Sequence, residues 1–217
     1  MSDPISAPSH PKPLCIVTGG SFGIGAAVCE TFNTKGYQVV NLDIQCNPQQ
    51  ADEIHWVDCD MSVIQKVSDA IKGVINQYGR VDCLVSNAGM HYSGTIEDTS
   101  ELAFEKVFNL NVKGAIAATQ AVLPYMKAQQ AGVILYMASD QALIAKPNSF
   151  AYNLSKAALA SMARTTAIDY ASYQIRANAI CPGTIETPLY HHAIERYVAK
   201  SGADNNKIHC EEAALQP

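Results

Sequence analysis

Short apolar runs alternate with longer segments of helical periodicity along most of the chain. The runs lack the strict polar alternation of a half-exposed strand, as expected for strands that are buried on both faces. Alternating strands and helices predict an α/β fold with one three-layer, doubly wound parallel sheet in a single domain over residues 14–217. Six strands are predicted, at 14–18, 37–43, 54–57, 81–86, 132–139 and 175–180, with helices at 24–35, from 62 onward, over most of 101–128 and at 150–170.

Composition excludes several other classes of protein. Apolar residues make up 48% of the 217 residues and charged residues 16%, which suits a packed core rather than a disordered or collagen-like chain. The net charge of -5 does not indicate a nucleic-acid or membrane-surface partner. No run approaches the roughly 18 apolar residues of a membrane-spanning helix. The proline-rich residues 1–13 are predicted to be a disordered polar arm, not a signal peptide or an anchor.

The seven cysteines are odd in number and include no C-x-x-C pair. Neither a disulfide framework nor a zinc site is therefore predicted. Several of the cysteines lie in apolar runs, where a free thiol behaves as a small hydrophobic group. We expect a protein of the reducing cytoplasm with no metal site.

A glycine-rich turn follows the first predicted strand and opens the first predicted helix. Glycines let the backbone approach a pyrophosphate closely, and a helix N-terminus favours its negative charge. The spacing is G-x-x-x-G-x-G, and an ordinary strand-to-helix turn is the alternative interpretation. The position after the first strand favours dinucleotide binding of the Rossmann type. The predicted cofactor residues of the turn are Gly19, Ser21, Phe22, Gly23, Ile24 and Gly25.

Asp43 ends the second predicted strand, 18 residues after Gly25. This separation is close to that of a carboxylate that accepts hydrogen bonds from the cofactor ribose and repels a 2′-phosphate. No Lys or Arg lies in the glycine turn to bind such a phosphate. The sequence therefore predicts NAD as the cofactor, with NADP less favoured. A solvated turn aspartate is the alternative.

Tyr152 and Lys156 lie four residues apart in the predicted helix at 150–170 and so share one of its faces. A free tyrosine has a pKa of about 10, which is too high for acid–base chemistry at neutral pH. A nearby ammonium group favours the phenolate and lowers that pKa. The pair could then exchange a proton with a substrate hydroxyl or carbonyl group. Taken alone, such a pair is common on solvated helix faces.

Together with the surrounding motifs, the chain from Leu14 onward resembles the classical short-chain dehydrogenase/reductase family. The motifs that carry this resemblance occur in the family's order and at compatible spacings. They are the glycine turn at 18–25, Asn87-Ala88-Gly89, Asn111-Val-Lys-Gly114, Ser139, Tyr152-x-x-x-Lys156 and Pro182-Gly183.

The resemblance implies four catalytic residues. Tyr152 would be the acid/base, and Lys156 would lower its pKa and bind the nicotinamide ribose. Ser139 would hydrogen-bond the substrate oxygen. Asn111 resembles the residue that supports a proton-relay water, although an asparagine inside a helix could instead satisfy backbone groups.

Further cofactor contacts are implied after three other predicted strands. Asp60, with Met61 beside it, matches the position that holds the adenine amino group. Its alternative role is to cap the helix that begins near Ser62, and the two roles can coexist. The remaining implied cofactor residues are Asn87, Ala88 and Gly89 after the fourth strand, and Pro182, Gly183, Ile185 and Thr187 after the sixth.

The implied reaction is hydride transfer between NAD(H) and the CH–OH or C=O group of a small-molecule alcohol or ketone. Polar residues at the expected pocket favour a hydroxylated substrate, such as a sugar or hydroxy acid, over a steroid or a long acyl chain. The predicted substrate residues are His91, Asp140, Gln141, Asn148 and Tyr190, with Tyr92, Leu143, His191 and His192 as further candidates.

Two other functions stay open at this point. A non-catalytic dinucleotide-binding sensor or scaffold is the main alternative, and the intact catalytic set argues against it. A nucleotide-sugar epimerase is less favoured, because a large substrate domain is missing. Members of the family have about 250 residues, so residues 187–217 are expected to form an incomplete substrate loop region that lacks a seventh strand. The family also implies a homo-oligomer, either a dimer or a homotetramer.

Overall fold

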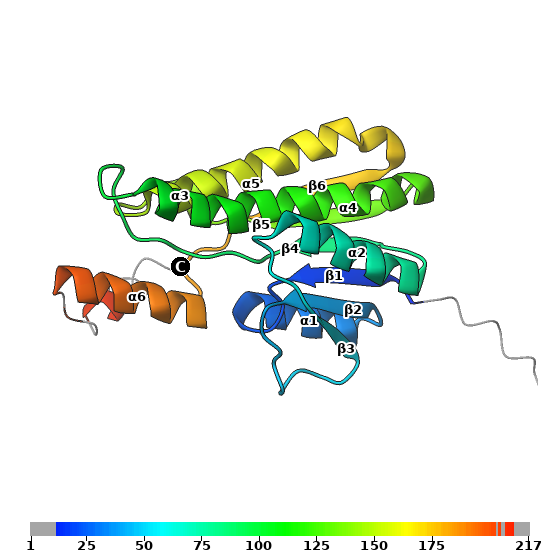
Figure 1. Cartoon of the computed structure of the whole chain (residues 1–217), viewed down its shortest axis with the longest axis horizontal. Helices are drawn as coiled ribbons and strands as arrows, with labels where there is room; N and C mark the ends of the chain where they lie inside the picture. The colour runs from blue at the N-terminus through cyan, green and yellow to red at the C-terminus, as the bar shows by residue number, and fades with distance from the viewer. Residues whose placement is uncertain (1–11, 203, 205–206, 211–217) are drawn as a thin grey trace, which may run out of the picture.

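The computed structural model describes residues 12–202, 204 and 207–210. Residues 1–11 of the predicted arm lie outside the described residues. The described part forms one parallel sheet in the order β3-β2-β1-β4-β5-β6 (Figure 1), which confirms the predicted doubly wound fold. Its strands are β1 (Leu14–Thr18), β2 (Gln38–Asp43), β3 (Ile54–Asp58), β4 (Cys83–Ser86), β5 (Gly132–Met137) and β6 (Ile175–Ile180).

The strand order reverses between β1 and β4. From β1 the chain moves outward to β3, and it then crosses back to place β4 on the other side of β1. Doubly wound sheets bind ligands in the crevice at such a reversal, beyond the carboxyl ends of the strands. The topology therefore fixes where a site can form.

Helices cover the two faces of the sheet unequally. On one face lie α2 (Ile64–Tyr78), α4 (Gly114–Gln129) and α5 (Phe150–Asp169), whose apolar side chains join the larger core cluster. On the other face α1 (Gly23–Thr34) packs on β1, β2 and β3, within a smaller cluster that also includes residues of β4. On that second face Arg176 and Asn178 of β6 are exposed.

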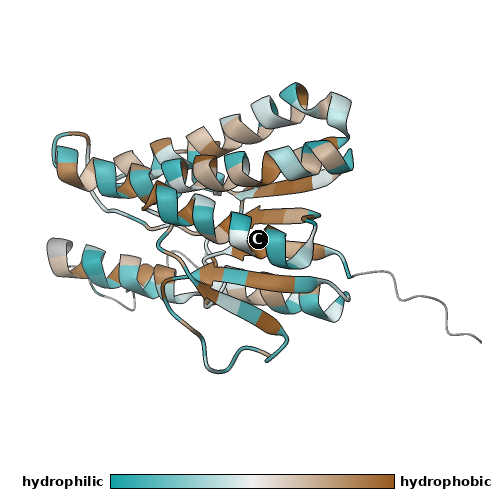
Figure 2. Cartoon of the chain, turned by 45° about the vertical axis from the view of Figure 1, so that its right-hand side comes forward, coloured by the Kyte–Doolittle hydropathy of each residue, from teal (hydrophilic) through white to brown (hydrophobic). Residues whose placement is uncertain are grey.

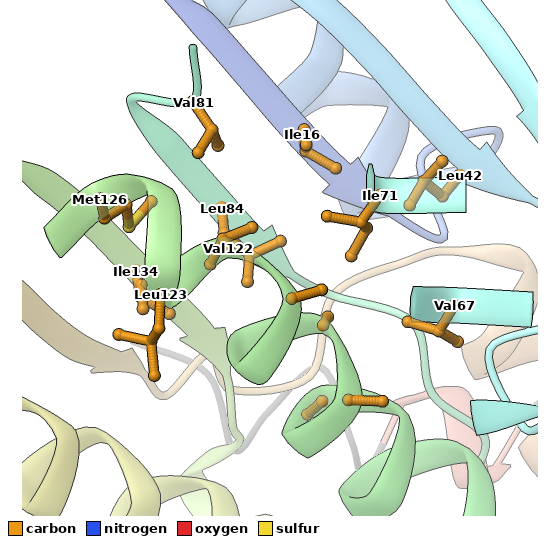
Figure 3. Packing of buried hydrophobic residues seen from close by; sticks show 14 of the residues in the cluster. Ile16, Leu42, Val67, Ile71, Val81, Leu84, Val122, Leu123, Met126 and Ile134 are labelled. Atoms are coloured by element: carbon orange, nitrogen blue, oxygen red, sulfur yellow. The ribbon is translucent and has the colours of Figure 1, made fainter. Parts of the chain in front are cut away.

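The larger core is built from branched side chains on the strands and on the inward sides of α2 and α4. Figure 3 shows Val67 and Ile71 of α2 beside the strands, with Val122 of α4 close to Leu84 of β4. The strands are hydrophobic along most of their length, whereas the outer sides of the helices carry hydrophilic residues (Figure 2). This pattern explains why the strands could be predicted without polar alternation. No helix among the described residues is long and apolar enough to span a membrane.

The structure divides the predicted helical region at 101–128 into three pieces. It contains α3 (Glu101–Phe108), a π-helical turn (Asn109–Lys113) and α4. A π-helical turn inserts an extra residue into the helix and often marks a functional site. The predicted strand at 132–139 ends earlier, at Met137, because Ser139 begins a short 3-10 turn at Asp140–Ala142.

The predicted substrate loop region contains a helix among its described residues. Thr187 caps a helix, α6 (Pro188–Ser201), because its hydroxyl accepts a hydrogen bond from the backbone N–H of Tyr190. A proline at the first helical position suits this start. Figure 1 shows α6 beyond the sheet, next to the end at which the strands finish. Among the described residues no seventh strand joins the sheet.

Two glycines provide a test of how closely the start of α4 packs on the segment between β3 and α2. A Cβ at Gly114 would lie 2.4 Å from the carbonyl oxygen of Met61, whereas a Cβ at Gly73 in α2 would meet nothing within 4 Å. We expect Gly114→Ala to lower the free energy of unfolding by about 1–3 kcal/mol. Gly73→Ala should raise it by about 0.5–1 kcal/mol. Urea unfolding measures both, and a Gly114→Ala protein as stable as wild type would contradict this packing.

Candidate active site

A cleft of about 950 Å³ lies beyond the carboxyl ends of the strands and reaches α6. It brings together residues from segments that are far apart in the sequence. Of the predicted catalytic residues, Ser139, Tyr152 and Lys156 line it. Of the predicted cofactor residues, all line it except Ser21. Of the predicted substrate residues, His91, Asp140, Gln141, Asn148 and Tyr190 line it, whereas Tyr92, Leu143, His191 and His192 do not.

The glycine turn is held against the segment that follows β4. Gly19 has a φ of +65°, and a Cβ there would lie 2.8 Å from the Cα of Ala88. A Cβ at Gly25 would lie 2.0 Å from the carbonyl oxygen of Gly19. Phe22 precedes α1 without a side-chain cap, so no side chain competes for the first N–H groups of this helix. The turn therefore presents a close backbone and a helix N-terminus, as an anion site requires.

Ser21 is fully buried and lies outside the cleft lining. Its backbone N–H donates to Asp43 Oδ2 (3.1 Å), and its hydroxyl donates to the Gln45 carbonyl oxygen. The same hydroxyl accepts a hydrogen bond from Asn41 Nδ2 (2.9 Å), and the Ser21 carbonyl accepts one from Asn47 Nδ2 (2.8 Å). Ser21 thus anchors the glycine turn to β2 and the loop after it.

Gly20 is tied down in the same way by two amide side chains. Its N–H donates to Asn41 Oδ1 (2.9 Å), and its carbonyl accepts a hydrogen bond from Gln50 Nε2 (2.9 Å). Asn41 Nδ2 also donates to Gln50 Oε1 (3.1 Å), which closes a ring of hydrogen bonds. Sequence reasoning missed Asn41, Asn47 and Gln50. The only signal for them is a concentration of amide residues in the segment after β2.

The carboxylate of Asp43 faces the same turn and is held in place by two backbone donors. Oδ2 accepts the hydrogen bond from Ser21, and Oδ1 accepts one from the N–H of Gln45 (3.2 Å). The residue is half-buried and lines the cleft. Its predicted position at the end of β2, beside the glycine turn, agrees with the structure.

Asp60 has the local capping role that was the alternative interpretation. Its Oδ1 accepts hydrogen bonds from the N–H (2.9 Å) and the hydroxyl (2.7 Å) of Ser62. These two bonds hold the pKa of Asp60 below its usual value. Asp60 and Met61 also line the cleft, so the capping contact does not remove them from it.

Tyr152 and Lys156 lie side by side on α5, and both are almost completely buried. Lys156 Nζ is 5.5 Å from the centre of the Tyr152 ring, and it donates a hydrogen bond to the Met137 carbonyl at the end of β5 (2.7 Å). Ser139 follows that strand, and its hydroxyl donates to Asp140 Oδ1 (2.8 Å). The three catalytic candidates are therefore joined through the end of β5.

Burial has the largest influence on the pKa values of Tyr152 and Lys156. It raises the pKa of Tyr152 above its usual value, although the hydrogen bond with the Ser139 side chain acts in the opposite direction. Burial also lowers the pKa of Lys156 to about 8. The Lys156 ammonium group is directed to the Met137 carbonyl, and burial has the largest influence on the pKa of Tyr152. Tyr152 is thus a protonated acid at neutral pH.

The side chain of Asn111 ties the π-helical turn to two other segments. Its Oδ1 accepts a hydrogen bond from the N–H of Met90 (2.8 Å), and its Nδ2 donates to the Met90 carbonyl (3.0 Å) and to Ser155 Oγ (3.0 Å). It is buried and does not line the cleft. The amide therefore satisfies backbone groups, as the alternative interpretation of this residue proposed.

His91 connects the substrate end of the cleft to Tyr152. The two rings meet edge to face with their centres 4.8 Å apart, and His91 Nε2 lies 3.2 Å from Ser149 Oγ. Burial, with smaller contributions from the charges of Arg196 and Lys146, lowers the pKa of His91 to about 4. The imidazole is neutral at physiological pH. Sequence reasoning missed Ser149 and Lys146, which also line the cleft.

The comparisons with known proteins agree with this site. A sequence model described as "short chain dehydrogenase" matches residues 13–197. The chain belongs to the short-chain dehydrogenase family. It is 38% identical over 189 residues to 2-(R)-hydroxypropyl-CoM dehydrogenase of Xanthobacter autotrophicus, covering 81% of this chain and 76% of that protein. A ligand-free aldohexose dehydrogenase of Thermoplasma acidophilum superimposes with a TM-score of 0.83 at 34% identity, covering 91% of this chain and 75% of that one.

Members of this family bind a nicotinamide dinucleotide. Two other similar structures carry different forms of it. A 3-ketoacyl-(acyl-carrier-protein) reductase of Brucella melitensis is complexed with NADH (29% identity, TM-score 0.79, covering 82% of this chain and 78% of that one). ElxO has NADP bound (27% identity, TM-score 0.79, covering 85% and 79%). The cleft offers the backbone cradle and the carboxylate that such a cofactor needs. The described residues contain no group of three or more His, Cys, Asp or Glu side chains placed to hold a metal ion.

The hydrogen bonds of Gln50 provide a test of the cofactor end of the cleft, which is the end formed by the glycine turn and Asp43. Gln50→Ala removes both of its bonds and leaves the Gly20 carbonyl less restrained, so the glycine turn loses part of its fixed shape. We expect the dissociation constant for NADH to rise roughly fivefold or more. Fluorescence titration of NADH measures it. Gln49→Ala is the control, because Gln49 is exposed and none of the hydrogen bonds found for it involves its side chain. Equal affinities in the two variants would contradict this role.

Proposed function

We propose that this protein is an NAD(H)-dependent dehydrogenase/reductase that interconverts the CH–OH and C=O groups of a small hydroxylated substrate, with Tyr152 as the acid/base. The observation that carries this proposal is the convergence of Ser139, Tyr152 and Lys156 in the cleft that also contains the glycine turn and Asp43. A binding protein without catalysis needs the turn but not the buried Tyr–Lys pair, whose desolvation costs free energy.

The bound nicotinamide supplies the hydride acceptor or donor. The protein's residues hold the substrate oxygen and move its proton. In reduction, the Tyr152 phenol donates a proton to the carbonyl oxygen. In oxidation, the ionised phenolate accepts the hydroxyl proton. Rotation of the Ser139 hydroxyl away from Asp140 would let it donate to the same substrate oxygen. Lys156 places a positive charge beneath the Tyr152 ring, which favours the phenolate when it forms.

The preference for NAD rests on Asp43. Its carboxylate is fixed by two backbone N–H groups beside the glycine turn, where it can accept hydrogen bonds from a ribose 2′-hydroxyl. A 2′-phosphate at the same place would meet a like charge and the carbonyl oxygen of Gln45, which the Ser21 hydroxyl holds nearby. Both groups disfavour NADP.

A small hydroxylated substrate fits the polar lining near Tyr152, and one structural neighbour is an aldohexose dehydrogenase. The oligomeric state and the location in the cytoplasm stay predictions. For a homo-oligomer, the exposed apolar side chains Ile116 of α4, and Leu154 and Ile168 of α5, offer surface that a second copy could cover.

The acid/base role is tested with Tyr152→Phe. We expect turnover to fall by a factor of at least about 100, while the affinity for NADH stays within about threefold, because the variant removes one hydroxyl and keeps the ring. A screen of alcohols and ketones, followed by NADH absorbance, gives the turnover. Tyr37→Phe is the control, since Tyr37 packs on Phe32 on the side of α1. Retained turnover in Tyr152→Phe would disprove the assignment.

The same measurements should show a characteristic pH dependence in the wild-type protein. Because burial raises the pKa of Tyr152, the phenolate needed for oxidation becomes more abundant only as the pH rises. The rate of oxidation should therefore increase with pH. The rate of reduction, which needs the phenol, should be retained at low pH and fall at high pH.

The cofactor preference is tested with Asp43→Ala. Removal of the carboxylate eliminates its hydrogen bonds to a ribose and its repulsion of a 2′-phosphate. We expect the ratio of kcat/KM for NAD over NADP to fall at least about tenfold. Steady-state kinetics with both cofactors measure the ratio. A wild-type protein that already prefers NADP would show that the proposed cofactor is wrong.

A further inference from the structure

Three buried side-chain atoms have no hydrogen-bond partner among the described residues, namely Nδ1 of His91, Oε1 of Gln141 and Oδ1 of Asn153. His91 and Gln141 line the cleft, whereas Asn153 does not. Buried polar atoms are almost always paired in proteins, so an unpaired one at a ligand site requires an explanation.

The hydroxyl of Ser149 occupies the other ring nitrogen of His91. Ser149 Oγ lies 3.2 Å from His91 Nε2 and 3.3 Å from the Pro147 carbonyl oxygen. Its single proton goes to one of the two, so Nε2 either donates to Ser149 Oγ or accepts from it. A neutral imidazole carries one proton, so Nδ1 then has either a free lone pair or a free N–H, and a hydroxyl group pairs with both.

The surroundings of His91 keep the ring neutral. The guanidinium group of Arg196 donates to the His91 carbonyl (3.4 Å), and the positive charges of Arg196 and Lys146 oppose a third charge at the ring. Burial acts in the same direction. Nδ1 therefore belongs to a neutral ring at physiological pH, and it requires a hydrogen-bonding partner.

Gln141 lies two residues after Ser139, in a turn that is fixed by its backbone. The Gln141 N–H donates to Ser139 Oγ (3.2 Å) and to Asp140 Oδ1 (2.7 Å). The position of the side chain is thus coupled to the catalytic serine. Its amide oxygen, Oε1, is the second unpaired atom of the cleft lining. A hydroxyl group both donates and accepts, so it pairs with either orientation of this amide.

We propose that the end of the cleft lined by His91 and Gln141 selects a polyhydroxylated substrate, a polyol or sugar in which at least one hydroxyl besides the reacting one pairs with His91 Nδ1 or with Gln141. The inference rests on the proposed hydride-transfer function and specifies its substrate class. An alcohol with only the reacting hydroxyl leaves both atoms unpaired. Sites that are built to hydrogen-bond a hydroxyl discriminate strongly against analogues that lack it.

The test compares substrates that are matched in carbon skeleton. Purified full-length protein with NAD is assayed on 2,3-butanediol against 2-butanol, and on an aldohexose or cyclic polyol against cyclohexanol. We expect kcat/KM to be at least about tenfold higher for the polyhydroxylated member of each pair. Equal or better use of the monofunctional alcohols would overturn the proposal. Absence of hydride transfer from every substrate would instead count against the proposed function itself.

Two variants assign the preference to these atoms. In Gln141→Leu and in His91→Phe, the ratio of kcat/KM between the polyhydroxylated and monofunctional substrates should fall at least about fivefold. His91→Asn keeps a polar atom near the position of Nδ1 and should retain most of the ratio. Gln77→Leu is the matched control, because Gln77 is exposed on α2 and does not line the cleft.

Thermal unfolding and NADH titration separate this role from a structural one. The variants are expected to unfold near the wild-type temperature and to bind NADH with wild-type affinity. The effect of the substitutions should then appear only in the ratio of kcat/KM between the polyhydroxylated and monofunctional substrates. If the ratio is unchanged in both Gln141→Leu and His91→Phe, these atoms do not select the substrate and the proposal fails.

Discussion

Parallel pairing of the strands is the constraint on which the rest of this structure depends. Because all strands of the sheet run in one direction, their carboxyl ends meet at one edge. The glycine turn after β1, Asp43 at the end of β2, Asn87 after β4 and Ser139 after β5 are therefore neighbours in space. The reversal of strand order between β1 and β4 opens the crevice in which they face one another. The parallel pairing of the strands thus brings together functional groups that are spread over more than a hundred residues of sequence.

Buried amides and one buried ammonium group then fix this edge in a particular shape. Asn41 holds the glycine turn, Asn111 holds the segment after β4, and Lys156 holds the end of β5 through the Met137 carbonyl. Each is almost fully buried, and each pairs with at least one backbone group of the segment that it holds. Leaving such groups unpaired would cost about 1–3 kcal/mol each. These hydrogen bonds make the site rigid. They also mean that a loop cannot be replaced by another sequence without loss of this shape.

The sequence predicted the features that depend on local pattern. Apolar runs and glycine positions placed the strands and the cofactor turn, and the i, i+4 spacing placed Tyr152 beside Lys156. Features that depend on partners far away in the chain could not be predicted. The burial of Ser21 follows from a loop that folds back from β2. The π-helical turn around Asn111 follows from contacts to Met90 and Ser155. The raised pKa of Tyr152 follows from packing, which spacing along one helix does not reveal.

The two ends of the cleft differ in whether their polar groups are hydrogen-bonded within the protein. This difference has a physical consequence. At the cofactor end, the polar groups of Gly20 and Ser21 are paired within the protein, so this end keeps its shape whether or not a ligand is present. At the other end, His91 and Gln141 keep buried atoms without partners. Pairing at the first end gives affinity through a preformed surface. Unpaired atoms at the second end make binding depend on the hydrogen-bonding groups of the ligand, since only a matching ligand recovers the cost of their burial. The proposed function needs one end that always binds the same cofactor and another end that selects the substrate, and the difference in hydrogen bonding fits these two tasks.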